Sequence, residues 1–82
     1  MKKRYVYILQ SIEHPDQFYT GLAENMSSRL AAHNAGQPSH TAKFKPWRVV
    51  SAHWFENPQV AAAFERYLKS GSGRAFAAKR LR

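Results

Sequence analysis

The chain has 82 residues, too few to divide into two hydrophobic cores, so we expect one domain over residues 1–82. Hydrophobic residues make up 44% of it, which excludes a disordered chain, and the absence of cysteine excludes disulfide staples and thiolate zinc sites. Thirteen Lys and Arg residues against five Asp and Glu residues give a net charge of +8, which favours a polyanionic partner, above all nucleic acid.

The first residues, MKKR, have the charge of a signal peptide, but the apolar run behind them ends at Gln10 and no small-residue cleavage site follows. No apolar stretch is long enough to span a bilayer, and the basic residues form no amphipathic anchor helix. We therefore expect a soluble cytoplasmic protein with no membrane partner. An ordinary basic surface is the alternative to nucleic-acid binding.

The first predicted elements are two strands and a helix. Arg4 to Ile12 is rich in Tyr, Val, Ile and Leu without alternation, which is typical of a strand covered on both faces. Turn residues follow at positions 14–16, and Gln17 to Leu22 then predicts a second strand that forms a hairpin with the first. Asn25 is suited to cap a helix that Gly36 would end.

The second half of the chain alternates a loop, a strand and helices. Residues 37–45 are polar and basic and lie next to prolines, which predicts an exposed loop, and residues 47–55 predict the third strand. Asn57-Pro58 begins a second helix, which the glycines of residues 71–73 are expected to end. Residues 74–81 predict a short third helix that is too basic for a core. The order β-β-α-β-α(-α) indicates an α+β fold.

Two basic side chains on the first predicted helix are candidate site residues. Arg29 and His33 are four positions apart and lie on one side of the helix, with His33 near the middle of its apolar face and Arg29 at the edge. Cations in this place are costly unless an anion such as a phosphate meets them. In the alternative, Arg29 extends to solvent and His33 is a hydrogen-bonded core residue.

Glu65 is the only acidic residue after Glu56, and it flanks the apolar stripe of the second predicted helix. One carboxylate can hold a hydrated Mg²⁺, because this ion keeps several waters and needs only one or two carboxylates besides a substrate phosphate. No second carboxylate is suitably placed, so any metal chemistry would use one ion. The alternative is a solvated Glu65 paired with Lys69 four positions later.

Tyrosines on the hairpin complete a pattern, although hairpin tyrosines also pack simply as core residues. The pattern consists of Tyr5-Val6-Tyr7, Tyr19-Thr20-Gly21, Arg29 and Glu65. In this order and spacing the chain resembles the GIY-YIG nuclease family, as one catalytic domain similar to its small stand-alone bacterial members. The resemblance implies a three-stranded antiparallel sheet flanked by helices. It also implies divalent-metal-dependent cleavage of DNA with Mg²⁺ or Mn²⁺ and no small-molecule cofactor, in a process such as DNA repair or recombination.

The resemblance also implies roles for single residues. Tyr7 and Tyr19 take the places of the motif tyrosines, Gly21 that of the motif glycine, Arg29 that of the arginine on the scissile phosphate, His33 that of a histidine found in several branches, and Glu65 that of the metal ligand. Tyr19 is the expected general base for the attacking water, and Tyr7 orients the water or the phosphate. Only about one tyrosine in a thousand is ionised at pH 7, so Arg29 and the metal are expected to lower the pKa of Tyr19. His33 is the alternative base or a proton relay.

Three positions depart from the family pattern. Tyr5 replaces the first glycine of the first motif, and Leu22 stands where some members have a lysine near the catalytic tyrosine. The late asparagine of several branches has no clear counterpart, with Ser70 or Ser72 lying nearby. These departures support an alternative function, that of a non-catalytic nucleic-acid-binding protein that keeps the GIY-YIG fold.

The other basic residues are candidate contacts to DNA phosphates. They are Lys43, Lys45, Arg48, Arg74, Lys79 and Arg80. A further alternative is a protein-interaction module in which Trp47, Trp54 and Phe55 form an exposed apolar patch. The nuclease hypothesis instead expects most of these three side chains to be buried or to face DNA.

Overall fold

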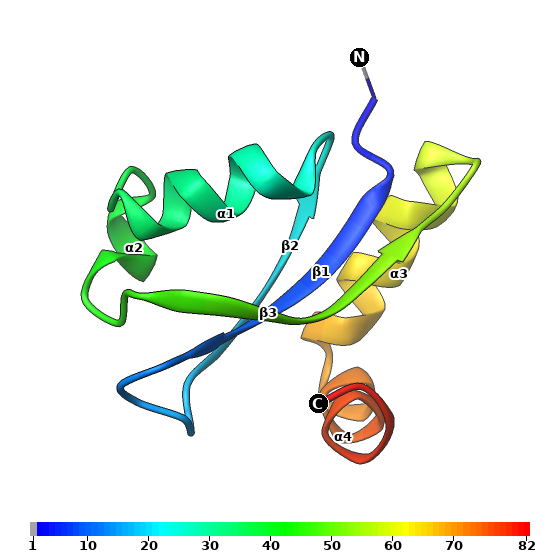
Figure 1. Ribbon diagram of the computed structural model, residues 1–82. Coiled ribbons are helices and arrows are strands. Elements are labelled where there is room, and N and C mark those ends of the chain that lie inside the picture. The colour runs from blue at the N-terminus through cyan, green and yellow to red at the C-terminus, as the bar shows by residue number, and fades with distance from the viewer. Residues whose placement is uncertain (1) are drawn as a thin grey trace.

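The structure, a computed structural model, describes residues 2–82 and has the predicted α+β architecture. Its elements are β1 (Tyr5–Ser11), β2 (Phe18–Ala23), α1 (Met26–Asn34), α2 (Ser39–Ala42), β3 (Trp47–Trp54), α3 (Pro58–Lys69) and α4 (Gly71–Arg80) (Figure 1). The three strands form one antiparallel sheet in the order β2-β1-β3. The predicted hairpin, sheet and element order are confirmed.

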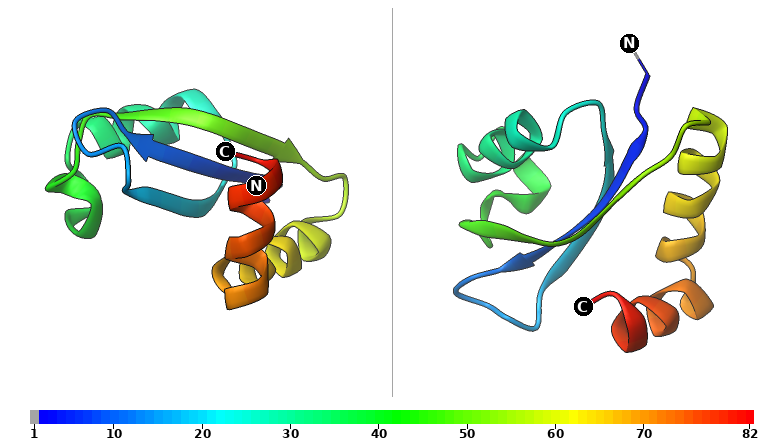
Figure 2. Two further views of the ribbon diagram at one scale, coloured as in Figure 1. Left: turned by 90° about the horizontal axis from the view of Figure 1, so that it is seen from below. Right: turned by 45° about the vertical axis from the view of Figure 1, so that its right-hand side comes forward.

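The middle strand, β1, builds both halves of the core. Neighbouring side chains on a strand point to opposite faces, so Val6 and Ile8 face one side of the sheet and Tyr7 and Leu9 the other. All four are at most 1% exposed, as expected for a strand covered on both faces. Val6 and Ile8 pack with Leu68 and other residues of α3 and α4, while Tyr7 and Leu9 belong to the cluster on the α1 side. The helices therefore cover the two faces in pairs, α1 with α2 and α3 with α4 (Figures 1 and 2).

Asparagine caps fix the starts of two helices. The side chain of Asn25 accepts a hydrogen bond from the backbone N–H of Ser28, and Asn57 caps α3 in the same way, followed by Pro58 in the first turn. Past the end of α1, Gly36 has a φ of +79°, in the left-handed region that glycine adopts readily. The predicted starts and the glycine stop of α1 are confirmed.

The predicted exposed loop over residues 37–45 is partly wrong, because this segment contains α2 and buries Thr41, which is 3% exposed. The Thr41 hydroxyl donates to the carbonyl oxygen of Pro38 at 3.1 Å. The indole N–H of Trp47 donates to the Thr41 carbonyl oxygen at 3.0 Å. These bonds hold a single helical turn against the sheet, and such a turn is too short for a visible apolar period.

The glycines of residues 71–73 do not separate α3 from an outlying helix. α3 ends at Lys69, and the Ser70 side chain accepts a hydrogen bond from the N–H of Gly73, so it caps α4, which begins at Gly71 rather than at residue 74. The expectation that this last helix lies outside the core is also wrong for one face, since Ala77 is 4% exposed. Small residues on that face let α4 pack closely against the core while its basic residues point outward.

The aromatic patch required by the interaction-module alternative is not formed. Trp47 is 3% exposed and Phe55 packs against the core, whereas Trp54 alone of the three is 53% exposed. The burial expected under the nuclease hypothesis is therefore met by two of the three. Among residues 2–82, no helix combines the length and apolarity that a membrane crossing would need.

Candidate active site

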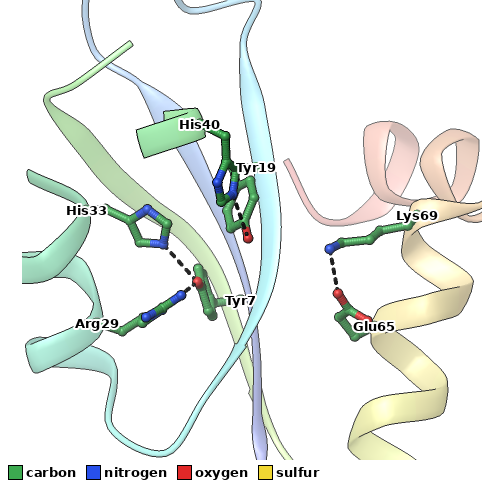
Figure 3. A network of polar contacts seen from close by, with 7 residues as sticks. All are labelled: Tyr7, Tyr19, Arg29, His33, His40, Glu65 and Lys69. Carbon is green, nitrogen blue, oxygen red and sulfur yellow. Dashed lines mark hydrogen bonds and ion pairs between the residues drawn. The ribbon is translucent and has the colours of Figure 1, made fainter. Parts of the chain in front are cut away.

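Tyr7, Arg29 and His33 meet on the α1 side of the sheet (Figure 3). The hydroxyl of Tyr7 lies 2.9 Å from His33 Nε2, and Arg29 donates from Nε to the same hydroxyl at 3.3 Å. Tyr7 and His33 are both fully buried. The predicted pairing of Arg29 and His33 on one helix face thus brings both to a tyrosine on β1. His33 is also a hydrogen-bonded core residue, as in the alternative reading.

The direction of each hydrogen bond follows from Thr41, which lies at the end of the network opposite Arg29. Thr41 uses its only hydroxyl hydrogen on the Pro38 carbonyl, so its oxygen accepts from His33 Nδ1–H at 2.9 Å. His33 Nε2 is then an acceptor for the Tyr7 O–H, and the Tyr7 oxygen accepts from Arg29. The opposite arrangement would give the Tyr7 oxygen two N–H donors and break the Thr41–Pro38 bond. The network therefore holds a neutral histidine in the Nδ1–H tautomer.

The electrostatics of the site agree with this arrangement. Burial raises the pKa of Tyr7, an effect that outweighs the opposing hydrogen bond and charge of Arg29. Burial also lowers the pKa of His33, assisted by the positive charge of Arg29 and by His40. At neutral pH Tyr7 is thus protonated and His33 is neutral. Arg29 makes its hydrogen bond to Tyr7, while its electrostatic interaction with Tyr19 contributes less to its own raised pKa.

Tyr19 lies beside this network on the edge strand β2. Its ring centroid is 5.1 Å from that of His33 and 6.2 Å from that of Tyr7. The Tyr19 hydroxyl is 3.5 Å from Nε2 of the exposed His40, and Lys69 Nζ lies 5.5 Å from the ring centroid. His40 and Lys69 are thus residues at the site to which the sequence assigned no site role.

Gly21 is directly opposite Tyr7 in the pairing of β1 with β2. A β-carbon at this position would lie 2.5 Å from the Tyr7 hydroxyl oxygen and 3.0 Å from the Tyr19 ring. Because both neighbours are fixed parts of the site, only glycine leaves room for the Tyr7 side chain to reach His33. The need for glycine here therefore already exists within the protein, before any substrate is considered.

Glu65 lies on α3, across β2 from the Tyr7 network. Its Oε2 forms an ion pair with Lys69 Nζ at 2.6 Å, and this hydrogen bond raises the pKa of Lys69. The alternative i,i+4 pairing is thus present, while Lys69 points from Glu65 toward Tyr19 (Figure 3). Figure 3 shows Glu65 on the other side of Tyr19 from Tyr7 and Arg29, so the predicted site is divided into two parts.

The donor set suits only one kind of metal site. Among residues 2–82 there is no group of three His, Asp or Glu side chains that could hold an ion. A single carboxylate fits a hydrated Mg²⁺ or Mn²⁺ that completes its shell with water and a substrate phosphate. Glu65 meets this requirement, provided that Lys69 gives up or shares its oxygen.

Of the predicted phosphate-binding cations, Arg74 lines a pocket together with Tyr19. Lys43 lies over the ring of Phe44 at 5.2 Å, and Arg48 donates to the Gln10 side chain at 2.5 Å. Lys45 lies near Gly36. Lys43 and Lys45 lie between the end of α2 and the start of β3, and Arg48 lies at the start of β3.

Two further features bear on the family pattern. Arg29 lines a pocket of about 330 Å³ together with Lys3, Asn25 and Ser28, so its side chain borders open space at the start of α1. The Ser70 hydroxyl donates to the Tyr67 carbonyl oxygen at 2.6 Å and caps α4. Ser70, which lies near the position of the missing asparagine, therefore has a structural role.

Comparisons with known proteins agree with this architecture. A model of the GIY-YIG catalytic domain matches residues 3–79. UPF0213 protein CPE1444 of Clostridium perfringens is 36% identical over 66 residues, which cover 79% of this chain and 69% of that protein. UPF0213 protein SH2523 of Staphylococcus haemolyticus is 33% identical over 73 residues, which cover 88% of this chain and 87% of that protein.

A eukaryotic relative extends the comparison to a named nuclease. The structure-specific endonuclease subunit SLX1 of Debaryomyces hansenii is 35% identical over 71 residues, which cover 78% of this chain and 20% of that protein. No solved structure matches the chain. Because the family model spans almost the whole sequence, the chain belongs to the GIY-YIG nuclease family.

Proposed function

We propose that this protein is a divalent-metal-dependent DNA endonuclease that hydrolyses phosphodiester bonds with one metal ion. The observation that carries the proposal is the network of Arg29, Tyr7 and His33, in which a fixed cation and a prearranged proton acceptor share one tyrosine hydroxyl. The likeness to a structure-specific endonuclease subunit supports DNA as the substrate and a role in repair or recombination. The net charge of +8 suits a polyanionic substrate.

Arg29 would bind the scissile phosphate. Its Nε is engaged by Tyr7, which fixes the guanidinium plane, and its terminal nitrogens remain to donate to phosphate oxygens from the edge of the pocket at the start of α1. Its pKa is raised, chiefly by the hydrogen bond to Tyr7, so the charge is permanent. A fixed donor of this kind stabilises the additional negative charge of the transition state.

Tyr7 and His33 would accept the proton of the attacking water. The Tyr7 oxygen takes the water proton while its own proton passes to His33 Nε2, so the pair needs no ionised tyrosine in the resting state. This assignment replaces the sequence-based preference for Tyr19, whose hydroxyl lies 3.5 Å from Nε2 of the exposed His40. Since Tyr7 is fully buried in the free protein, the attacking water would have to reach its hydroxyl when DNA binds, with the Arg29 contact kept.

Tyr19 and Glu65 would complete the site from the other side. Tyr19 orients the phosphate or the water, as its place between the two halves suggests (Figure 3). Glu65 would hold Mg²⁺ or Mn²⁺, which when bound supplies positive charge to the phosphate and the leaving oxygen. Lys69 would give up its ion pair with Glu65 on binding of the metal and remain beside Tyr19.

The test is nicking of supercoiled plasmid DNA by the wild type with Mg²⁺, with Mn²⁺ and with EDTA. We expect cleavage only with metal, complete loss in Glu65→Gln and wild-type cleavage in Glu56→Gln, a matched control at an exposed glutamate. Cleavage by Glu65→Gln would contradict the metal site. A wild type that binds DNA but never cuts it would establish the alternative, a non-catalytic nucleic-acid-binding protein.

A further inference from the structure

A second pocket adjoins the candidate active site, with Tyr19 belonging to both. It has a volume of about 320 Å³ and is lined by Phe18 and Tyr19 of β2, Leu68 and Lys69 of α3, Arg74 of α4, and Arg82. In Figure 3 Tyr19 lies between Arg29 on one side and Lys69 on the other. A strand of DNA held at Arg29 would therefore pass Tyr19 to enter this pocket.

The pocket has the chemistry of a nucleotide site. Three of its lining residues are cations and none is acidic, which suits a phosphate. Phe18 and Leu68 add an apolar wall, which suits a base or a sugar. The Glu65 carboxylate lies next to the pocket through its ion pair with Lys69 and is not part of the lining.

Two of the cations already lie over aromatic rings. The Arg82 guanidinium is 4.0 Å from the centroid of the Phe18 ring, and Lys69 Nζ is 5.5 Å from that of Tyr19. Unpaired bases stack on guanidinium planes and aromatic rings in nucleic-acid complexes. Phe18 and Arg82 thus form a stacking platform beside the cations that would hold a phosphate.

We propose that this pocket binds one unpaired nucleotide next to the phosphate that is cut. The base stacks on Arg82, which is supported by Phe18, and Arg74 and Lys69 bind the adjoining phosphate. This inference rests on the proposed nuclease function and adds the substrate class to it. Because a paired base would first have to leave the duplex stack, the pocket favours DNA with an unpaired nucleotide beside the cleavage site.

The test compares the affinity of the protein for two DNA duplexes that differ only by one bulged nucleotide. Binding is measured by fluorescence anisotropy with wild-type protein in EDTA, so that the DNA stays intact. We expect a preference of about tenfold for the bulged duplex, as stacking of one base on such a platform provides. Arg82→Lys keeps the charge but removes the plane, so it should abolish the preference as fully as Arg82→Gln.

The control is Arg66→Gln, which removes the same charge from an exposed site on α3 outside the pocket and should leave the ratio of affinities unchanged. A 5-iododeoxyuridine at the bulged position should crosslink to the peptide that contains Phe18 and Tyr19. An unchanged ratio in Arg82→Lys would overturn the proposal. So would a crosslink elsewhere.

The outcomes separate this inference from the nuclease proposal. If the protein prefers the bulged duplex but cuts no DNA with any metal, the proposed nucleotide pocket stands and the proposed nuclease function is wrong. If the protein cuts DNA but its ratio of affinities for the two duplexes does not depend on Arg82, the proposed nuclease function stands and the proposed nucleotide pocket is wrong.

Discussion

The substitution Thr41→Val tests the hydrogen-bond network without changing the shape of a buried side chain. Valine replaces the hydroxyl with a methyl group, so His33 Nδ1–H loses its acceptor at 2.9 Å while the volume of the site is kept. Whichever tautomer the ring then adopts, one buried polar group is left without a partner, which costs about 1–3 kcal/mol of unfolding free energy. For a domain of this size, each kcal/mol lowers Tm by about 4–8 °C.

The tautomer of His33 should also change. Without an acceptor at Nδ1, the ring proton is better placed on Nε2, where it would donate to the Tyr7 oxygen. The Tyr7 hydroxyl would then lose its proton acceptor, so kcat should fall while KM stays close to the wild-type value, since Thr41 touches no substrate. Thr41→Ser keeps the hydroxyl and should restore both the tautomer and kcat, at a small cost in stability from the lost methyl group.

The assay is a long-range ¹H–¹⁵N NMR correlation of the imidazole nitrogens at pH 7, run beside urea unfolding and cleavage kinetics. Wild type and Thr41→Ser should show a protonated Nδ1 and a bare Nε2, and Thr41→Val the reverse. A bare Nε2 in Thr41→Val with unchanged kcat would refute the reasoning, because Thr41 would then not set the tautomer. Because the NMR signal needs no DNA, this result is independent of whether the protein cleaves it.

Three other predictions follow from the same site. Gly21→Ala should lower the unfolding free energy measured in urea by about 1–3 kcal/mol, because its β-carbon would lie 2.5 Å from the Tyr7 hydroxyl. Gly71→Ala should not, because that position has open space, and equal effects of the two substitutions would contradict the close approach. His33 has a lowered pKa in the folded state, so the unfolded chain binds the extra proton, and stability should fall as the pH drops below about 6.5. His33→Gln should remove this loss. If the urea midpoint of the wild type does not fall from pH 7.5 to pH 5, a buried neutral ring is contradicted. Arg29→Lys keeps the charge but not the planar group held by Tyr7, so single-turnover cleavage should slow by roughly 10²–10³-fold while DNA affinity stays nearly unchanged. Cleavage at the wild-type rate would show that Arg29 does not stabilise the transition state.

Much of the fold could be predicted because its signals are local. The caps Asn25 and Asn57 and the left-handed Gly36 act through neighbouring backbone groups, so the sequence around them contains the necessary information. The run of apolar residues in β1 predicts a central strand because both faces need covering. The start of α4 was missed because Ser70 caps it while also bonding the Tyr67 carbonyl, an arrangement that depends on how α3 ends.

The site was predicted in part for the same reason. The spacing of Arg29 and His33 on one helix places them together, but their common partner, Tyr7, comes from a strand distant in sequence and was placed through the family pattern. Thr41 and His40 were missed because α2 is a single turn without a recognisable period. A threonine close behind a proline, in a segment that leads into a buried tryptophan, is the signal that could have indicated an anchored turn.

In the proposed site Arg29 and Tyr19 contact one DNA phosphate, Tyr7 lies beside it to accept the proton of the attacking water, and Glu65 holds the metal ion on the opposite side. The most direct measurement is a crystal structure of the protein with DNA and Ca²⁺, chosen so that the bond stays uncut. We expect one phosphate against the Arg29 guanidinium and the tyrosines, with the ion between this phosphate and Glu65 and with Lys69 moved off the carboxylate. DNA bound on another face, with the Glu65–Lys69 pair intact, would contradict it.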